Sequence, residues 1–81
     1  MEIVFSRDFK KEFKKIKDKN TRLKIIKQIR KLKQIPKSGK PLKYKFKNHR
    51  SVKIPPFRII YKIKKDRITI NCFDHRDSSY K

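Results

Sequence analysis

Six side chains in the second half of the chain have the types needed for acid–base and phosphate chemistry. They are His49, Lys53, Arg58, His75, Arg76 and Tyr80. Histidine exchanges protons near neutral pH, lysine and arginine bind phosphate oxygens, and tyrosine stacks on nucleobases. Together they have the parts for cleaving RNA with the substrate's own 2′-hydroxyl. A base removes the hydroxyl proton, cations stabilise the phosphorane, and an acid protonates the leaving 5′ oxygen. This chemistry requires no metal ion or cofactor.

Taken one at a time, these residues also have simpler interpretations. A lysine or arginine on a strand of a very basic chain is most often surface charge. His75, between Asp74 and Arg76, fits an exposed histidine in a charged loop. Tyr80 is next to the last residue, where chains often fray. A functional interpretation therefore depends on whether the fold brings these side chains together.

The charge balance of the chain indicates an anionic partner. Its 81 residues include 27 Lys and Arg against 7 Asp and Glu, for a formal net charge of +20. Such a charge attracts polyanions, so nucleic acid, an acidic protein or both are the expected partners. The lysine-rich surface of a heat-adapted protein is the alternative. Such surfaces match lysine with glutamate in ion-pair networks, and this chain has too few acidic residues for that.

Several classes of function are disfavoured by what the sequence lacks. The single Cys72 forms no internal disulfide, and one Cys with two His offers no zinc set of the usual spacing. Carboxylates without a paired-acid motif argue against a two-metal nuclease. No apolar run has the length of a signal peptide or a membrane span. We therefore expect a cytoplasmic protein with no metal site and no membrane association.

The N-terminal segment predicts a short strand followed by a helix. Residues 1–5 end in an apolar run suited to a strand. Ser6 is a favourable helix N-cap, and Asp8 in the first turn suits the helix dipole. The apolar residues of this helix recur at helical spacing between lysines and are Phe9, Phe13 and Ile16.

A second helix is predicted after a break at residues 18–21. Asn20 or Thr21 is expected to cap it, and Pro36 to end it. Its apolar stripe consists of Leu23, Ile25, Ile26, Ile29 and Leu32. Because the break is short, the two helices are expected to form an antiparallel pair.

The rest of the chain has the alternation of short strands. Residues 37–41 form a turn-rich connector, and residues 42–47 alternate apolar and basic side chains in a strand or an extended basic arm. Three further strands are predicted at residues 49–54, 57–63 and 68–73. The sequence thus predicts one α+β domain of residues 1–81 in the order β-α-α-β-β-β. Two N-terminal helices pack on one face of a small, largely antiparallel twisted sheet.

Alternation along these strands assigns each side chain to a face. His49, Ser51 and Lys53 share one face of their strand. If that face is continuous with the Arg58 face of the next strand, the polar groups converge on an open sheet surface. The chain that leaves the last strand would bring His75 and Arg76 to the edge of this surface.

The last strand follows the same alternation. Its core-facing residues are predicted to be Ile68, Ile70 and Cys72, and the residues of its other face Thr69, Asn71 and Phe73. Cys72 is therefore expected to be a buried thiol and not a nucleophile.

The segment Phe57-Arg58-Ile59-Ile60-Tyr61 resembles the YRxxY strand of the RelE/ParE superfamily of toxin–antitoxin toxins. His75-Arg76 followed by Tyr80 resembles the end of the same pattern, and Gly39 to Leu42 resembles the GxxL connector before the sheet. The resemblance covers nearly the whole chain and includes the order of its elements. It implies a toxin that a cognate antitoxin neutralises.

The resemblance also implies roles for individual side chains. In the RelE branch, toxins cut mRNA in the ribosomal A site. Arg58 matches the arginine that binds the scissile phosphate, and Lys53 matches a basic position on the preceding strand. Arg76 matches an arginine implicated in leaving-group stabilisation, and Tyr80 matches the tyrosine that stacks on a base.

The general base is the role that the resemblance leaves open. The best-known RelE proteins carry two lysines on the strand where this chain has His49 and Ser51. In the related YoeB-type toxins, a histidine near the C-terminus serves in acid–base catalysis. The segment from Cys72 to His75 resembles the end of that pattern, so the resemblance gives this role to His75.

The leading hypothesis is thus a ribosome-dependent, metal-independent mRNA endoribonuclease toxin. Its expected partners are an acidic, RelB-like antitoxin, the ribosome and mRNA. A ParE-type toxin that poisons DNA gyrase is the first alternative, because it shares the fold without needing the catalytic cluster. A non-catalytic RNA-binding protein, for which the charge alone suffices, is the second. The basic, histidine-bearing sheet face favours the nuclease.

Overall fold

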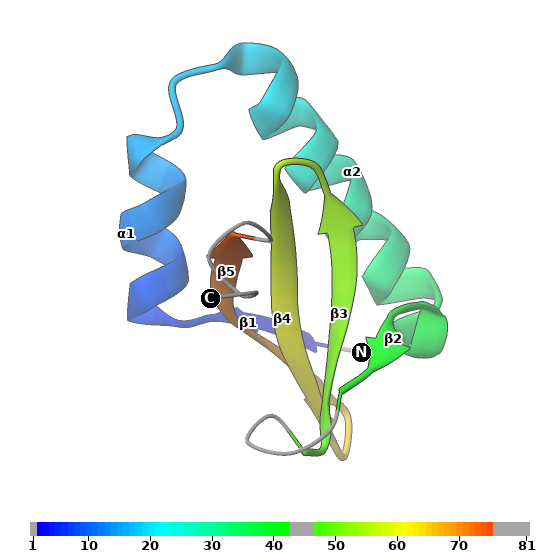
Figure 1. Cartoon of the computed structure of the whole chain (residues 1–81). Helices are drawn as coiled ribbons and strands as arrows, with labels where there is room; N and C mark the ends of the chain where they lie inside the picture. The colour runs from blue at the N-terminus through cyan, green and yellow to red at the C-terminus, as the bar shows by residue number, and fades with distance from the viewer. Residues whose placement is uncertain (1, 43–46, 76–81) are drawn as a thin grey trace.

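The computed structural model describes residues 2–42 and 47–75, with only the backbone described for His75. Figure 1 shows the elements in their chain order. They are β1 (Glu2–Phe5), α1 (Arg7–Lys15), α2 (Lys19–Gln34), the 3-10 helix η1 (Pro36–Ser38), β2 (Lys40–Pro41), β3 (His49–Ile54), β4 (Phe57–Lys64) and β5 (Arg67–His75). The alternation predicted for residues 42–47 falls largely outside the described residues.

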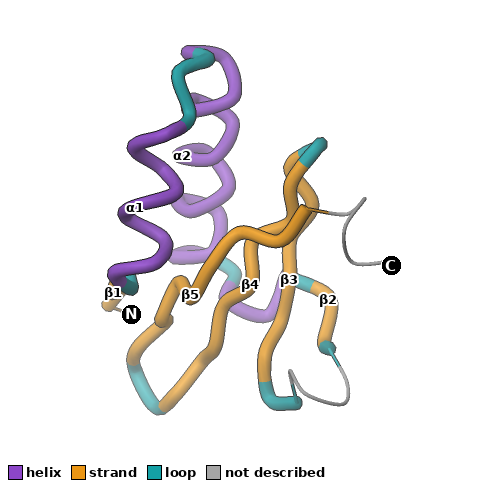
Figure 2. Tube along the Cα trace, turned by 60° about the vertical axis from the view of Figure 1, so that its left-hand side comes forward, coloured by secondary structure: helices purple, strands orange, loops and turns teal. Residues whose placement is uncertain are grey.

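The strands form one five-stranded sheet in the order β1-β5-β4-β3-β2. Strand β1 is parallel to β5, and every other neighbouring pair is antiparallel. Both helices lie on one face of the sheet (Figure 2). The predicted α+β fold, with two N-terminal helices on a largely antiparallel sheet, is confirmed. The structure adds the short strand β2 where the sequence indicated a connector, and it places β1 at the far edge beside β5.

Each helix begins at a side-chain cap. Ser6 Oγ accepts a hydrogen bond from the Phe9 amide at 3.0 Å, as predicted for α1. At α2 the cap is Asp18, and the prediction of Asn20 or Thr21 is wrong. The Asp18 carboxylate accepts hydrogen bonds from the hydroxyl and the amide of Thr21, and these bonds lower its pKa, the hydroxyl bond most of all. A carboxylate also suits the positive end of the helix dipole, so the helix begins earlier than expected.

The hydrophobic core lies between the helices and the sheet. Its buried residues are Phe9, Ile25, Leu32, Ile54, Ile59, Tyr61, Ile68 and Ile70. Of the predicted stripe on α2, Ile25 and Leu32 are fully buried, whereas 49% of Leu23 and 38% of Ile26 remain exposed. Part of the stripe therefore faces solvent. Neither α1 nor α2 combines the length and apolarity needed to cross a membrane.

A β-bulge in β5 changes the direction of the residues after it. The register between β4 and β5 shifts by one residue because Asn71 is extra on β5. Phe73 consequently faces the helices, where its ring stacks on Phe9 with the centroids 4.8 Å apart. Cys72 lies on the opposite face. The strict alternation predicted for this strand is therefore wrong beyond Ile70.

The bulge is bonded to the start of α1. Ser6 Oγ, which caps the helix, also donates a hydrogen bond to the Asn71 carbonyl oxygen. The Ser6 amide donates to the Ile70 carbonyl oxygen at 3.0 Å. One serine therefore connects the end of a helix to the irregular point of the sheet.

Tyr61 of β4 holds the connector after α2 against the sheet. Its hydroxyl donates to the Pro36 carbonyl at 2.7 Å and accepts from the Gly39 amide at 3.0 Å. A Cβ at Gly39 would overlap this hydroxyl and lie 2.8 Å from the Ser51 carbonyl oxygen, so the close approach requires glycine. Arg50 Nη1 donates to the Gly39 carbonyl at 2.8 Å. Burial raises the pKa of Tyr61 and keeps the hydroxyl protonated.

We expect Ser6→Ala to lower the free energy of unfolding by about 1–2 kcal/mol, because it removes an N-cap and leaves the bulge carbonyl without its donor. Urea denaturation followed by circular dichroism measures this change. Asp18→Ala is the control, since it removes an exposed cap that has no described bond to the sheet, and it should lower the midpoint less. Equal effects of the two variants would show that the Ser6–Asn71 bond adds nothing.

We expect Tyr61→Phe to lower the free energy of unfolding by about 1–3 kcal/mol, because it leaves the buried Gly39 amide without an acceptor. Ser38→Ala removes an exposed hydroxyl from the same connector and should leave the thermal midpoint near that of the unaltered chain. A Tyr61→Phe midpoint equal to that of Ser38→Ala would contradict the role given to the hydroxyl.

Candidate functional site

Three charged residues form a row across the open face of the sheet, the face opposite the helices. Lys53 of β3 is paired with Arg58 of β4, which is paired in turn with Asp74 of β5. Residues directly opposite on neighbouring strands have side chains on the same face and close together. We call Lys53, Arg58 and Asp74 the charged row. Its two cations are the ones that alternation predicted to share this face.

Arg58 and Asp74 form an ion pair within this row. The Nη2 and Oδ2 atoms are 2.5 Å apart, and 26% of each side chain is exposed. The Nε atom of Arg58 is buried and has no hydrogen-bond partner within the described part of the chain. The contact therefore uses one guanidinium nitrogen and is not a two-point fork. Because a guanidinium carries five N–H donors, a single carboxylate contact leaves it able to bind another anion.

His49 lies at the other end of the open face. It is paired with Lys62 and is four residues from Lys53 along β3, or about 13 Å at the usual strand rise. Between them, Ser51 is buried opposite the buried Ile60. The predicted polar face is therefore present, but its charged groups form two clusters. The fold brings Lys53 and Arg58 together and keeps His49 apart from them.

The remaining predicted site residues follow Asp74 in the sequence. His75 is the last residue of β5, and its backbone is paired with Phe57. That position is at the same end of the sheet as the charged row. Arg76 and Tyr80 lie outside the described residues.

Cys72 is on the open face, not on the core face where alternation placed it. It is paired with Ile60 because of the bulge. The thiol is partly buried, and this burial raises its pKa, with smaller contributions from the negative charges of Asp74 and Asp8. A thiol that stays protonated at neutral pH is a poor nucleophile, in agreement with the role expected from the sequence.

Asp74 is the member of the charged row that the sequence analysis did not select. Strict alternation after Ile68 and Ile70 would place it on the core face, where an ionised carboxylate is costly to bury. A charged residue at a predicted core position was therefore the sequence signal that this strand is irregular. The bulge at Asn71 resolves this conflict by moving Asp74 to the open face beside Arg58.

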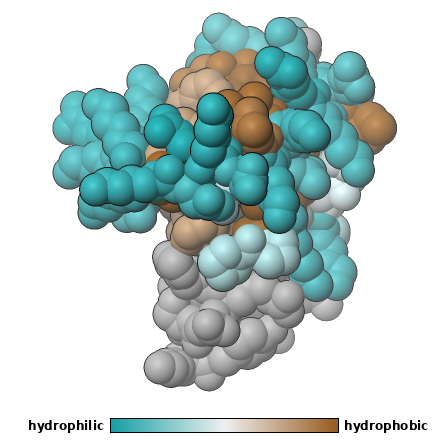
Figure 3. Space-filling model, turned by 90° about the horizontal axis from the view of Figure 1, so that it is seen from above, coloured by the Kyte–Doolittle hydropathy of each residue, from teal (hydrophilic) through white to brown (hydrophobic). Residues whose placement is uncertain are grey.

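An apolar groove lies between the two helices, away from the open face. We call it the helix groove, and it is lined by Phe5, Phe9, Lys10, Phe13, Lys14, Arg22, Ile26 and Ile29. The Arg22 guanidinium lies over the Phe13 ring, 4.7 Å from its centroid. Seen from above, the surface is mostly hydrophilic, with hydrophobic side chains exposed between the hydrophilic ones (Figure 3).

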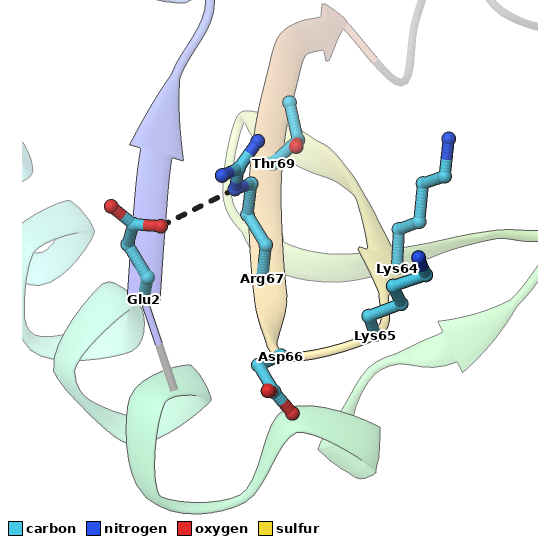
Figure 4. A pocket seen from close by; sticks show the side chains of 6 residues that line it. All are labelled: Glu2, Lys64, Lys65, Asp66, Arg67 and Thr69. Atoms are coloured by element: carbon cyan, nitrogen blue, oxygen red, sulfur yellow. Dashed lines mark hydrogen bonds and ion pairs between the residues drawn. The ribbon is translucent and has the colours of Figure 1, made fainter.

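A second pocket lies at the β4–β5 turn. It is lined by Glu2, Lys64, Lys65, Asp66, Arg67 and Thr69 (Figure 4). Glu2 and Arg67 form an ion pair of 3.3 Å, with 66% and 60% of their side chains exposed. This pair is at the opposite end of β5 from Asp74. Among residues 2–42 and 47–75, no three His, Cys, Asp or Glu side chains are placed to hold a metal ion.

Comparison with known families identifies the class of protein. A family model for the ParE toxin of type II toxin–antitoxin systems, parDE, matches residues 3–80. The fold and this match define a toxin of a type II toxin–antitoxin system. The chain belongs to the ParE toxin family, and the resemblance to the RelE/ParE superfamily is confirmed.

Solved structures share this fold at low sequence identity. The YoeB/ParE toxin from Agrobacterium tumefaciens is 21% identical with a TM-score of 0.83, over 94% of this chain and 99% of that one. The YoeB–YefM complex from Staphylococcus aureus is 18% identical with a TM-score of 0.79, over 94% and 97%. The RelB–RelE antitoxin–toxin complex from Methanococcus jannaschii is 21% identical with a TM-score of 0.67, over 95% and 94%. No curated protein sequence matches the chain significantly.

Proposed function

We propose that the protein is a ribosome-dependent endoribonuclease that cleaves mRNA without a metal ion, with the substrate 2′-hydroxyl as nucleophile. The observation that carries the proposal is the pairing of Lys53 with Arg58 on the open face of the sheet. Adjacent cations bind a phosphate and stabilise the negative charge that develops in the phosphorane. Both side chains remain accessible in part, so a single RNA strand can reach them.

The proton transfers are proposed to involve the residues that follow Asp74. In this mechanism His75 exchanges protons with the reacting oxygens, Arg76 stabilises the leaving group and Tyr80 stacks on a base. Strand β5 ends at His75, at the end of the sheet where Lys53 and Arg58 lie. These residues therefore follow directly from the charged row in the sequence.

His49 is proposed to contact a neighbouring part of the same RNA strand. At about 13 Å along β3 from Lys53, it is too far away to act on the phosphate that Arg58 binds. An open groove beside it adds cations for the RNA backbone. The basic residues that line this groove with His49 are Lys37, Lys47, Arg50, Lys62 and Lys64.

Inhibition of DNA gyrase is the second candidate function. The match to the ParE family model favours it, since the matching family is named for that branch of the superfamily. A gyrase inhibitor needs a binding surface but no group that cleaves a phosphodiester. The Lys53–Arg58 pair on an accessible sheet face is what favours the nuclease over this candidate.

The proposed protein partner is an acidic antitoxin that occupies the helix groove. The groove combines apolar side chains, such as Ile26, with the basic side chains of Lys10, Lys14 and Arg22. An amphipathic segment with acidic flanks matches both properties. The similar structures include toxin–antitoxin complexes, YoeB–YefM and RelB–RelE among them.

We expect Arg58→Ala to lower mRNA cleavage by about a hundredfold, the usual loss for one donor to a developing oxyanion. The measurement is an in vitro translation reaction in which the 3′ ends of the mRNA are mapped. Arg67→Ala is the matched control, because Arg67 is an exposed arginine on the same face at the other end of β5 (Figure 4).

Circular dichroism must show that both arginine variants are folded. If Arg58→Ala cleaves mRNA at the same rate as Arg67→Ala, the charged row is not part of the cleavage site. If the unaltered chain does not cleave mRNA but inhibits supercoiling by gyrase, the protein is a gyrase inhibitor and not a nuclease.

We expect Ile26→Glu to weaken binding of the cognate antitoxin by about tenfold or more, because it places a charge among the apolar side chains of the groove. Leu23→Glu is the control, since Leu23 is also exposed on α2 but does not line the groove. Isothermal titration calorimetry of the free toxin measures both dissociation constants. Similar values for the two variants would mean that the antitoxin binds elsewhere.

A further inference from the structure

We propose that Asp74 is a built-in competitor for Arg58, so that an RNA phosphate must displace this carboxylate to reach the guanidinium. The inference rests on the proposed function in one respect, namely that the ligand is a phosphodiester of single-stranded RNA. It adds a residue that sets which RNA the site accepts.

The geometry places Asp74 where it competes directly. Arg58 and Asp74 are opposite each other on β4 and β5, and their Nη2 and Oδ2 atoms are 2.5 Å apart. A phosphodiester carries one negative charge, as a carboxylate does, and it accepts hydrogen bonds from the same N–H donors. A phosphate bound to Arg58 with Asp74 still in place would also bring two anions close together.

The Arg58–Asp74 ion pair is partly shielded from water, yet a single hydrogen bond holds it, so a phosphate can displace the carboxylate. With 26% of each side chain exposed, it is better shielded from water than the Glu2–Arg67 pair, whose side chains are 66% and 60% exposed. Shielding strengthens an ion pair. The contact nevertheless uses a single guanidinium nitrogen, and Nε has no acceptor within the described part of the chain. An incoming phosphate therefore replaces one hydrogen bond and not a two-point fork.

The consequence is selectivity for RNA that is already held elsewhere. A chain of net charge +20 attracts every polyanion it meets. Free anions and loosely bound strands compete poorly with a carboxylate that is fixed beside Arg58. A strand docked through other contacts is present at a high effective concentration and displaces it. Asp74 thus keeps free anions off Arg58 and allows binding there mainly to RNA that is already docked.

The first test measures binding of a 2′-O-methyl RNA oligonucleotide, which has no 2′-hydroxyl nucleophile and stays intact. We expect Asp74→Asn to bind about fivefold more tightly than the unaltered chain, which corresponds to the strength of a partly exposed ion pair. Glu2→Gln is the matched control, because it makes the same change in charge at the other arginine–carboxylate pair of the sheet (Figure 4). Fluorescence anisotropy should show a change of less than about twofold for this control.

The second test places both changes in a background that lacks the arginine. In Arg58→Gln, the gain from Asp74→Asn should disappear, because the competitor acts only through Arg58. Asp74→Ser provides a second neutral variant if Asp74→Asn does not fold. The inference is overturned if Asp74→Asn binds no more tightly than Glu2→Gln, if it binds more weakly, or if its gain persists in Arg58→Gln.

These measurements are independent of cleavage. If no variant cuts mRNA while the binding results hold, the proposed nuclease fails and Asp74 remains a competitor at an RNA-binding site. If cleavage occurs and the binding gain is absent, the nuclease stands and the competitor does not.

Discussion

The rest of the structure depends on the irregular point of β5. One extra residue, Asn71, shifts the register against β4, and the two residues that matter most beyond it exchange faces. Phe73 turns toward α1 and completes the core, while Asp74 turns toward Arg58. Ser6 fixes this arrangement from the other end of the chain, because its hydroxyl bonds both to the bulge and to the first turn of α1. Core packing and the charge of the open face therefore have a common origin.

Local patterns predicted the elements well and their irregularities poorly. The apolar spacing in α1 and α2 and the alternation in β3 and β4 depend on near neighbours, so periodicity alone locates them. The bulge is hydrogen-bonded to Ser6, which is 65 positions away, and no local pattern contains that bond. The parallel edge strand β1 is a similar case, because its position beside β5 is set by the whole fold and not by the residues beside it. The cap at Asp18 is different, since its carboxylate bonds to Thr21 only three residues further on.

The same distinction applies to the candidate site. Lys53 and Arg58 were predictable because the tight β3–β4 hairpin fixes their register, and a period of two then gives their common face. His49 was expected to join them, but the same register places it at the far end of the strand. Asp74 was missed because strict alternation sent it to the core. A charged residue at a predicted core position is thus a sequence signal for a bulge.

The two surfaces proposed for binding lie on opposite sides of the molecule. The charged row is on the open face of the sheet, and the helix groove is between α1 and α2, which cover the other face (Figure 2). A partner segment that fills only the groove leaves Arg58 accessible. An antitoxin that binds only there would therefore neutralise the toxin by extending around the sheet edge or by blocking its approach to its target. A segment that does reach the row would meet Asp74 just as the proposed RNA phosphate would, so one carboxylate would oppose both ligands.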